Sequence, residues 1–256
     1  MIPKIIHYCW FGRSELPEMA CQCIASWRKY FPGYEIKEWN EDNFDVMSIP
    51  YTAEAYRVRK FAFVSDYARF KILYDNGGIY FDTDVEVVKP MDDIVAAGAY
   101  MGMERDCNVD FTVNSGLGMA APKGLPAYED VLDKYATLHF IKPDGTLDKT
   151  TTVTIVTSTF LTNGLKPRVG IIDFDGIRIY PPEFFNPLNS ETKELNITAN
   201  TRTIHHYTGS WHNRKEKFVH WTRRHFGIRA SQVVSLLEHN PVYVVKRVYQ
   251  YFRRGK

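Results

Sequence analysis

The sequence has few cysteines for its 256 residues, and their spacing matches no zinc site. The four are Cys9, Cys21, Cys23 and Cys107. Only the Cys-x-Cys pair is closely spaced, and that pattern is a weak signal for a metal. We therefore expect free thiols in a reducing cytoplasm.

Long hydrophobic runs are also lacking. No stretch approaches the roughly 18 apolar residues of a membrane-spanning helix. The opening MIPKIIHYCWFG is apolar only briefly, contains His7 and lacks the cleavage region of a secretory signal. Internal repeats and low-complexity linkers are absent as well. We expect one large domain, or a domain with an appendage, and no membrane span.

The first forty residues predict a strand, a helix and a second strand. PKIIHYCWF indicates a buried strand, MACQCIASWRKYFPG a helix, and YEIKEWN alternates like a strand. This order is typical of a βαβ unit, so we expect an α/β fold. GAYMGME and NSGLGMAA are further strand candidates, and irregular chain is expected from RIYPPEFFNP to about Ile204.

The next segment predicts a helix followed by an interrupted strand. Ser65 is expected to cap the helix DYARFKILYDN, and Asn76-Gly77 to end it. GIYFDTDVEVV then indicates a buried strand, a break and a second short strand.

Two acids, Asp82 and Asp84, stand at that break. Carboxylates are rarely buried unless they are paired or bound to a cation. On a regular strand, acids two positions apart share a face. Mg²⁺ and Mn²⁺ take oxygen ligands and often share them with substrate phosphates. The pair therefore suggests a metal held against a diphosphate, with a solvated turn as the common alternative.

Phosphatases of the haloacid dehalogenase type offer another interpretation, because they too place D-x-D after an apolar strand. Their strand usually opens the domain, and a small or hydroxyl residue follows the acids. Here the acids come late and VEVVKP follows, so the match is poor.

Asp66 and Arg69 lie upstream at i, i+3, on one face of the predicted helix. The simple interpretation is a local ion pair that contributes a few tenths of a kcal/mol. The functional one places both at a polar pocket, with Arg69 near a phosphate or sugar hydroxyl and Asp66 near a sugar hydroxyl. The two residues alone favour the simple interpretation.

The span FVSDYARFKILYDNGGIYFDTDVEVVKPMDDI resembles the signature of the retaining glycosyltransferases of family 32. That signature is S-D-x-x-R, a helix, then G-G-x-Y-x-D-x-D. Its fixed positions are present as Ser65, Asp66, Arg69, Gly77, Gly78, Tyr80, Asp82 and Asp84. The family includes bacterial capsule-polysaccharide enzymes and yeast mannosyltransferases of the initiating type, and it is similar to the catalytic domains of glucosylating clostridial toxins.

The resemblance implies a fold and a domain division. It covers residues 1–212 and implies an α/β, GT-A-type catalytic domain there, with a basic helical C-terminal extension over residues 213–256.

Both ends of this span also resemble the family. In the toxins, the Trp of the first strand stacks on the uracil of the donor, which implies that role for Trp10, with core packing as the alternative. HHYTGSW resembles the closing H-x-x-x-S-W, which implies His206 in the metal shell and Ser210 and Trp211 at the diphosphate. His205 is one residue away, and the choice between the two histidines stays open.

VNSGLGMAAPKG falls where these enzymes face the donor sugar and the acceptor, which makes Asn114 a candidate there. The implied catalytic residues are Asp82, Asp84, Arg69 and Asn114. The implied metal ligands are Asp82, Asp84 and His206. The implied donor contacts are Trp10, Ser65, Asp66, Arg69, Tyr80, Asp82, Thr83, Ser210 and Trp211.

The implied reaction moves a sugar from a nucleotide diphosphate sugar to a hydroxyl of a saccharide or lipid-linked oligosaccharide. A UDP-sugar is favoured because Trp10 resembles a uracil platform, and Mn²⁺ or Mg²⁺ is the implied cofactor. The family suggests a role in bacterial capsule, exopolysaccharide or cell-surface glycan synthesis. A metal-dependent phosphohydrolase and a non-catalytic sugar-nucleotide or glycan-binding module remain alternatives. No nucleic-acid recognition module is apparent.

The charge of the chain is unevenly distributed. Residues 212–256 hold 11 Lys/Arg and two Asp/Glu, a net +9, which leaves −7 for residues 1–211 within the total of +2. Residues 231–254 also look amphipathic, which predicts either a helix packed on the body or an anchor for anionic lipid. With the anchor, we expect a cytoplasmic enzyme that is peripheral on the inner face of the cell membrane.

Overall fold

A computed structural model describes residues 1–106, 110–190 and 192–209. Nearly all of them belong to one compact unit, Met1–Asn189 with Glu194–Tyr207. The predicted domain boundary after residue 212 and the predicted basic helix lie outside the described residues, so both stay predictions.

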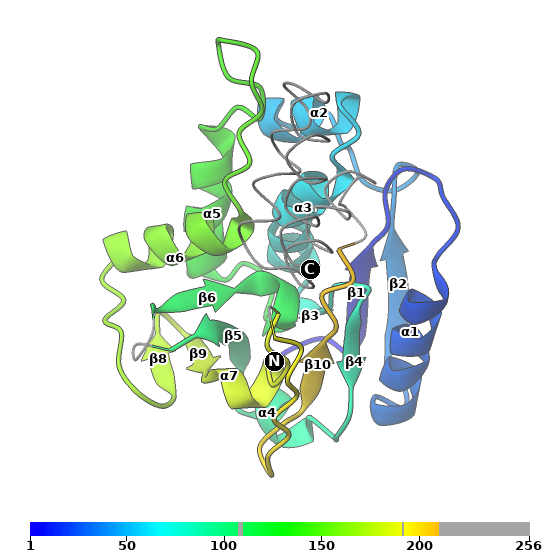
Figure 1. The fold of residues 1–256 in the computed structure, drawn as a ribbon, viewed down its shortest axis with the longest axis vertical. Coiled ribbons are helices and arrows are strands. Elements are labelled where there is room, and N and C mark those ends of the chain that lie inside the picture. The colour runs from blue at the N-terminus through cyan, green and yellow to red at the C-terminus, as the bar shows by residue number, and fades with distance from the viewer. Residues whose placement is uncertain (107–109, 191, 210–256) are drawn as a thin grey trace, which may run out of the picture. The chain divides into compact units, whose positions relative to one another are not determined.

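The unit alternates strands and helices (Figure 1). The strands are β1 (Ile5–Cys9), β2 (Glu35–Trp39), β3 (Gly78–Tyr80), β4 (Val85–Val87), β5 (Ala99–Arg105), β6 (Thr112–Asn114), β7 (Met119–Ala121), β8 (Ile172–Phe174), β9 (Ile177–Tyr180) and β10 (Thr203–His205). The helices are α1 (Glu18–Tyr30), α2 (Pro50–Arg57), α3 (Phe61–Asn76), α4 (Asp92–Ala96), α5 (Pro126–Ala136), α6 (Thr152–Thr162), α7 (Pro182–Phe185) and the short 3₁₀ helix η1 (Ser115–Leu117).

The predicted α/β class is confirmed by the sheet. An eight-stranded mixed sheet has the order β2-β1-β3-β7-β5-β9-β8, with β6 paired to β5. Strands β1 and β2 are parallel and α1 joins them, which is the predicted βαβ unit. Strands β1 and β3 are also parallel, so their carboxyl ends lie at one edge of the sheet. A separate antiparallel pair joins β10 to β4.

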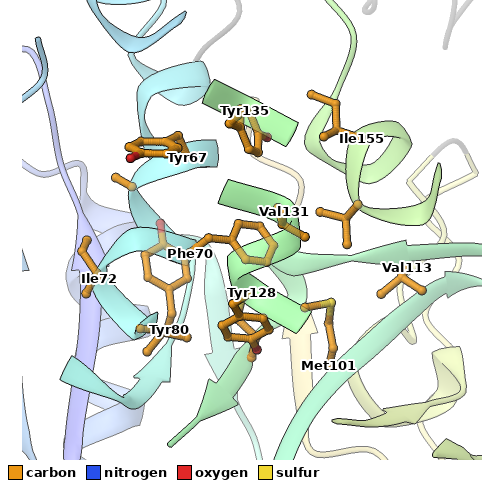
Figure 2. Close-up of a cluster of buried hydrophobic side chains, with 14 of the residues drawn as sticks. Tyr67, Phe70, Ile72, Tyr80, Met101, Val113, Tyr128, Val131, Tyr135 and Ile155 are labelled. Atoms are coloured by element: carbon orange, nitrogen blue, oxygen red, sulfur yellow. The ribbon is translucent and has the colours of Figure 1, made fainter. Parts of the chain in front are cut away.

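Hydrophobic residues fill both faces of the sheet. Successive residues of a strand point to opposite faces, and accordingly Ile79 belongs to one core cluster and Tyr80 to the other. Figure 2 shows the cluster that contains Tyr80, in which Tyr67 of α3 packs against Tyr135 of α5 and Phe70 of α3 against Tyr128 of α5. On the other face, Trp27 of α1 is fully buried and donates its Nε1–H to the Val85 carbonyl at 2.7 Å. The site is therefore built on a rigid, two-sided core.

One helix boundary differs from the prediction. Helix α3 begins at Phe61, so Ser65 lies inside it and does not cap it. The Ser65 hydroxyl instead donates to the Phe61 carbonyl at 3.3 Å, the back-bond that a serine makes within a helix. The predicted end at Asn76 is confirmed, with Gly77 beyond it at φ 68°.

The sequence predicted free cysteine thiols and no membrane-spanning helix. Cys9, Cys21 and Cys23 are free thiols. Of the described helices, none combines the length and apolar character that crossing a membrane requires.

Candidate active site

The acid pair lies in a turn between two strands. Strand β3 ends at Tyr80, and Asp82 closes the turn by accepting the Val85 N–H at its carbonyl, 3.0 Å away. The predicted interruption is confirmed, because Asp82 and Asp84 lie between β3 and β4 and not on a regular strand. The turn still stands at the carboxyl edge of β1 and β3, where ligands bind in open α/β sheets.

Arg69 is the centre of the polar cluster beneath this turn. Its Nη2 lies 2.9 Å from Asp66 Oδ1 and 3.1 Å from Asp82 Oδ1. Its Nε donates to the Ser65 carbonyl and its Nη1 to Ser115 Oγ. The side chain is only 4% exposed. The sequence motif therefore does assemble in space, and Arg69 contacts the acid turn directly.

Burial and charge compete in this cluster. Burial raises the pKa of Asp66 to about 7, against the opposing effect of the Arg69 guanidinium. Burial likewise raises the pKa of Asp82, again opposed by Arg69, and the Asp84 charge adds to the rise. Burial on its own would lower the pKa of Arg69, but Asp82, Tyr80 and Asp66 raise it above its ordinary value. Arg69 is thus a permanent positive charge among acids that burial makes harder to ionise.

The two oxygens of Asp82 have different surroundings. Its Oδ1 accepts the Tyr80 hydroxyl at 3.1 Å as well as Arg69. Its Oδ2 faces Gly116, where a Cβ would overlap it and would lie 3.1 Å from Asn114 Oδ1. Glycine at position 116 therefore permits the close approach of η1 to the acid turn.

Asn114 is held on both sides of its amide. Its Oδ1 accepts the Gly116 N–H at 2.7 Å, and its Nδ2 donates to Glu104 Oε2 at 2.7 Å. Neither Glu104 of β5 nor Ser115 of η1 was predicted to be at the site, because no local sequence pattern links either residue to the acid turn.

The two histidines make different contacts. His205, at the end of β10, places Nε2 3.1 Å from Asp84 Oδ1, and its ring lies edge-on to Tyr207. His206 lies 2.9 Å from Glu86 Oε2 through its Nε2, while its backbone N–H donates to the Asp84 carbonyl. Burial acts to lower the pKa of His205, but the Asp84 carboxylate outweighs it and raises that pKa. The structure places His205 rather than His206 against the acid pair, and the predicted role of His206 in a metal shell stays untested.

The remaining predicted donor contacts lie near this edge or outside the described residues. Trp10 directly follows β1 and is partly exposed, with its Nε1–H donated to the Ser14 carbonyl at 2.7 Å. Thr83 lies in the acid turn and is partly exposed. Ser210 and Trp211 lie outside the described residues, so their roles stay predictions.

The acid turn fits a hard divalent cation. Within the part of the chain that the structure describes, no three His, Cys, Asp or Glu side chains are grouped as a metal site. Mg²⁺ is usually bound by one or two carboxylates plus substrate phosphates, so two acids are enough. Asp82 Oδ1 is occupied by Arg69 and Tyr80, while Oδ2 makes no hydrogen bond or ion pair with the residues that the structure describes. Asp82 and Asp84 are therefore the residues that would hold the ion.

His7 shapes the glycine pair before the acid turn, which sequence reasoning did not anticipate. Its Nδ1 accepts the Trp39 Nε1–H at 3.0 Å, so its Nε2 must carry the proton donated to the Gly77 carbonyl at 2.9 Å. A Cβ at Gly78 would lie 2.8 Å from His7 Nε2 and from the Ile5 carbonyl. Gly78 is thus required by the close approach of β3 to β1, while a Cβ at Gly77 would meet Lys123 N and Pro3.

Residues 17–100 match the family model of a glycosyltransferase sugar-binding region containing a DXD motif. Inositol phosphoceramide mannosyltransferase 1 of Schizosaccharomyces pombe is 28% identical over 111 residues, covering 39% of this chain and 33% of that protein. Mannosyltransferase 3 of the same series is 31% identical over 108 residues, covering 39% and 29%. The chain spans about a third of the length of these relatives. The resemblance drawn from the motif is confirmed for this segment.

Solved glycosyltransferases are also similar to this chain, at lower sequence identity. The PaToxG glycosyltransferase is 18% identical with a TM-score of 0.49, covering 64% of this chain and 70% of that one. The galactosyltransferase LgtC, solved with donor and acceptor sugar analogues, is 13% identical with a TM-score of 0.45, covering 90% and 95%.

Proposed function

We propose that this chain, whose residues 17–100 carry the sugar-binding region of DXD glycosyltransferases, transfers a sugar from a nucleotide diphosphate sugar to an acceptor hydroxyl. The observation that carries the proposal is the turn of Asp82 and Asp84 at the carboxyl edge of the sheet, held from below by buried Arg69. An isolated surface turn needs no such support, and clustered acids with shifted pKa values are typical of functional sites.

The difficult part of the reaction is departure of the nucleotide diphosphate. As the bond between the anomeric carbon and the β-phosphate oxygen breaks, negative charge grows on that phosphate. A bound divalent cation supplies Lewis-acid stabilisation of this charge. Asp82 and Asp84 would hold that cation at the carboxyl edge of the sheet. Arg69 and Tyr80 engage Asp82 Oδ1, which leaves Oδ2 as the oxygen that would bind the cation.

The finer features of the proposal rest on the family resemblance. We take UDP to be the nucleotide because partly exposed Trp10 stands at the same sheet edge as a platform for a base. We propose a retaining reaction, in which the acceptor oxygen replaces the departing phosphate on the same face of the sugar and its proton passes to the phosphate.

We also propose a place for the enzyme in the cell. Capsule, exopolysaccharide or cell-surface glycan synthesis needs access to lipid-linked acceptors, and the basic residues 213–256 would favour an anionic membrane surface. The supporting observation is the separation of charge between that segment and the acidic body, with the enzyme then peripheral on the cytoplasmic face.

A panel of sugar nucleotides tests the proposal. Purified protein is incubated with UDP-glucose, UDP-galactose, their N-acetyl forms and GDP-mannose, with Mn²⁺ or with EDTA, and release of UDP or GDP is measured. We expect Mn²⁺-dependent hydrolysis of at least one sugar nucleotide, and loss of this activity in Asp82→Asn with an unchanged melting temperature. Binding without turnover would favour the non-catalytic module. Release of phosphate from simple esters would favour the phosphohydrolase.

A further inference from the structure

Glu104 is an acidic residue that the catalytic proposal does not use. It lies near the end of β5, where the register with β6 shifts between Met103 and Arg105. Met103 pairs with Val113 and Arg105 with Thr112, so Glu104 is the extra residue of a β-bulge. Bulges interrupt sheet pairing and often re-aim a side chain beside an active site. A side chain placed by such a device warrants a functional explanation.

The direction of the Glu104 side chain follows from its hydrogen bond. Gly102, two residues before Glu104, pairs with Asn114. Glu104 Oε2 accepts the Asn114 Nδ2–H at 2.7 Å. Because the Gly116 N–H can only donate, Asn114 Oδ1 must face Gly116 and its Nδ2 must face Glu104. The amide is therefore fixed in one orientation.

This arrangement leaves a donor and an acceptor side by side. The Asn114 amide has two N–H groups, and one is used by Glu104. Glu104 Oε1 accepts no hydrogen bond from the residues that the structure describes. Glu104 is partly exposed, unlike Asn114, which is 6% exposed. A sugar hydroxyl, which both donates and accepts, matches this pair.

The pair also lies beside the acid turn. Asn114 Oδ1 and Asp82 Oδ2 face one another across Gly116. A diphosphate held at Asp82 and Asp84 would present its sugar next to Asn114 and Glu104.

We propose that Glu104 recognises a hydroxyl of the transferred sugar and so determines which sugar is used. Glu104 Oε1 accepts the hydrogen of that hydroxyl, while the Asn114 amide donates a hydrogen bond to the hydroxyl oxygen. The inference rests on the proposed glycosyltransferase function and adds to it a residue that sets specificity.

Three variants and the wild type test this inference with the sugar-nucleotide panel in Mn²⁺. Glu104→Gln keeps an oxygen for Asn114 but removes the carboxylate, Glu104→Ala removes both, and Glu54→Gln is the control. Glu54 lies on α2, where its carboxylate accepts the Ile141 N–H and contacts His139. The readouts are kcat/KM for each sugar nucleotide and the dissociation constant of UDP alone.

We expect Glu104→Gln to lower kcat/KM for the preferred sugar about 10- to 100-fold, as loss of a charge-assisted hydrogen bond predicts, and to flatten the ranking of the sugars. UDP alone should bind within about twofold of wild type, because it lacks the sugar. Glu54→Gln should leave both readouts unchanged.

Three results would overturn the inference. If Glu104→Gln keeps the wild-type ranking and only Glu104→Ala is impaired, Glu104 merely positions Asn114. If Glu104→Gln weakens UDP as much as the sugar nucleotides, the effect is not on the sugar. If the wild type itself neither binds nor hydrolyses any nucleotide sugar, the proposed function fails and the inference fails with it.

Discussion

At the scale of single residues, the site depends on the contacts that the Arg69 side chain makes. From their i, i+3 spacing on a helix, Asp66 and Arg69 would be expected to form an ordinary exposed ion pair. In the structure, the Arg69 side chain is only 4% exposed and contacts the acid turn. The motif predicted that these residues act together. It did not predict that Ser115, 46 residues away, also binds the guanidinium. We expect Arg69 to act on the substrate through Asp82, since its Nη2 and Nε are already engaged.

Gly116→Ala tests the close approach of Gly116 to Asp82. The new Cβ would overlap Asp82 Oδ2, while the backbone conformation at this position suits alanine. We expect the affinity for UDP in the presence of Mn²⁺ to fall about tenfold or more, because a 1.4 kcal/mol displacement of the carboxylate already gives that factor. Calorimetric titration of UDP measures it.

The matched control is Gly33→Ala. Gly33 has φ 82° and no atom within 4 Å of an added Cβ. This change should lower the free energy of unfolding by about 1 kcal/mol through backbone strain and leave UDP affinity alone. Equal effects of the two variants on UDP affinity would mean that the close approach of Gly116 to Asp82 does not matter for UDP binding.

At the scale of secondary-structure elements, the pairing of β10 with β4 completes the site. His205 stands opposite Val85, which brings it to Asp84 across some 120 residues of sequence. The sequence left the choice between His205 and His206 open because strand register cannot be read from a short apolar segment. Helix α6 was missed for a related reason, since TVTIVTSTFLT is rich in β-branched residues that favour strands. Its cap, Thr151, accepts the Thr154 N–H.

His7 makes the junction of β1, β2 and α3 sensitive to acid. Burial lowers the pKa of His7 to about 4 from its ordinary value of 6.5. Between these values the unfolded chain binds a proton that the folded chain does not, so stability is lost as pH falls from 6.5 toward 4. The full loss is about 3 kcal/mol.

Urea unfolding between pH 7 and 4 measures this loss for the wild type and for His7→Gln. The variant is less stable at pH 7, but its stability should fall less over this range, by about the same 3 kcal/mol. Parallel pH profiles for the two proteins would show that His7 does not carry the effect.

At the scale of the whole molecule, the fold class could be predicted but the order of the strands could not. The βαβ start, the break at the acid pair and the end of α3 all follow from local patterns in the sequence. The antiparallel insertion of β7 between β3 and β5 depends on contacts among segments far apart in the chain. Glu104 and Ser115 were not predicted for the same reason, because only contacts between segments far apart in the chain bring them to the site.

The basic C-terminal segment gives a prediction about location. We expect the full chain to float with liposomes that contain anionic lipid, and a chain lacking residues 231–256 to float less, with high salt weakening the difference. Neutral liposomes serve as the control. Equal flotation of both chains would remove the membrane proposal without affecting the proposed chemistry.

The central claim is that Asp82 and Asp84 hold a divalent cation against the diphosphate of a nucleotide sugar. Calorimetric titration of UDP into the wild type and into Asp82→Asn, with Mn²⁺ and with EDTA, tests it most directly. We predict that either EDTA or the substitution weakens UDP binding about 100-fold or more, and that combining them adds little, because both remove one interaction. UDP binding of equal strength with Mn²⁺ and with EDTA would contradict the account.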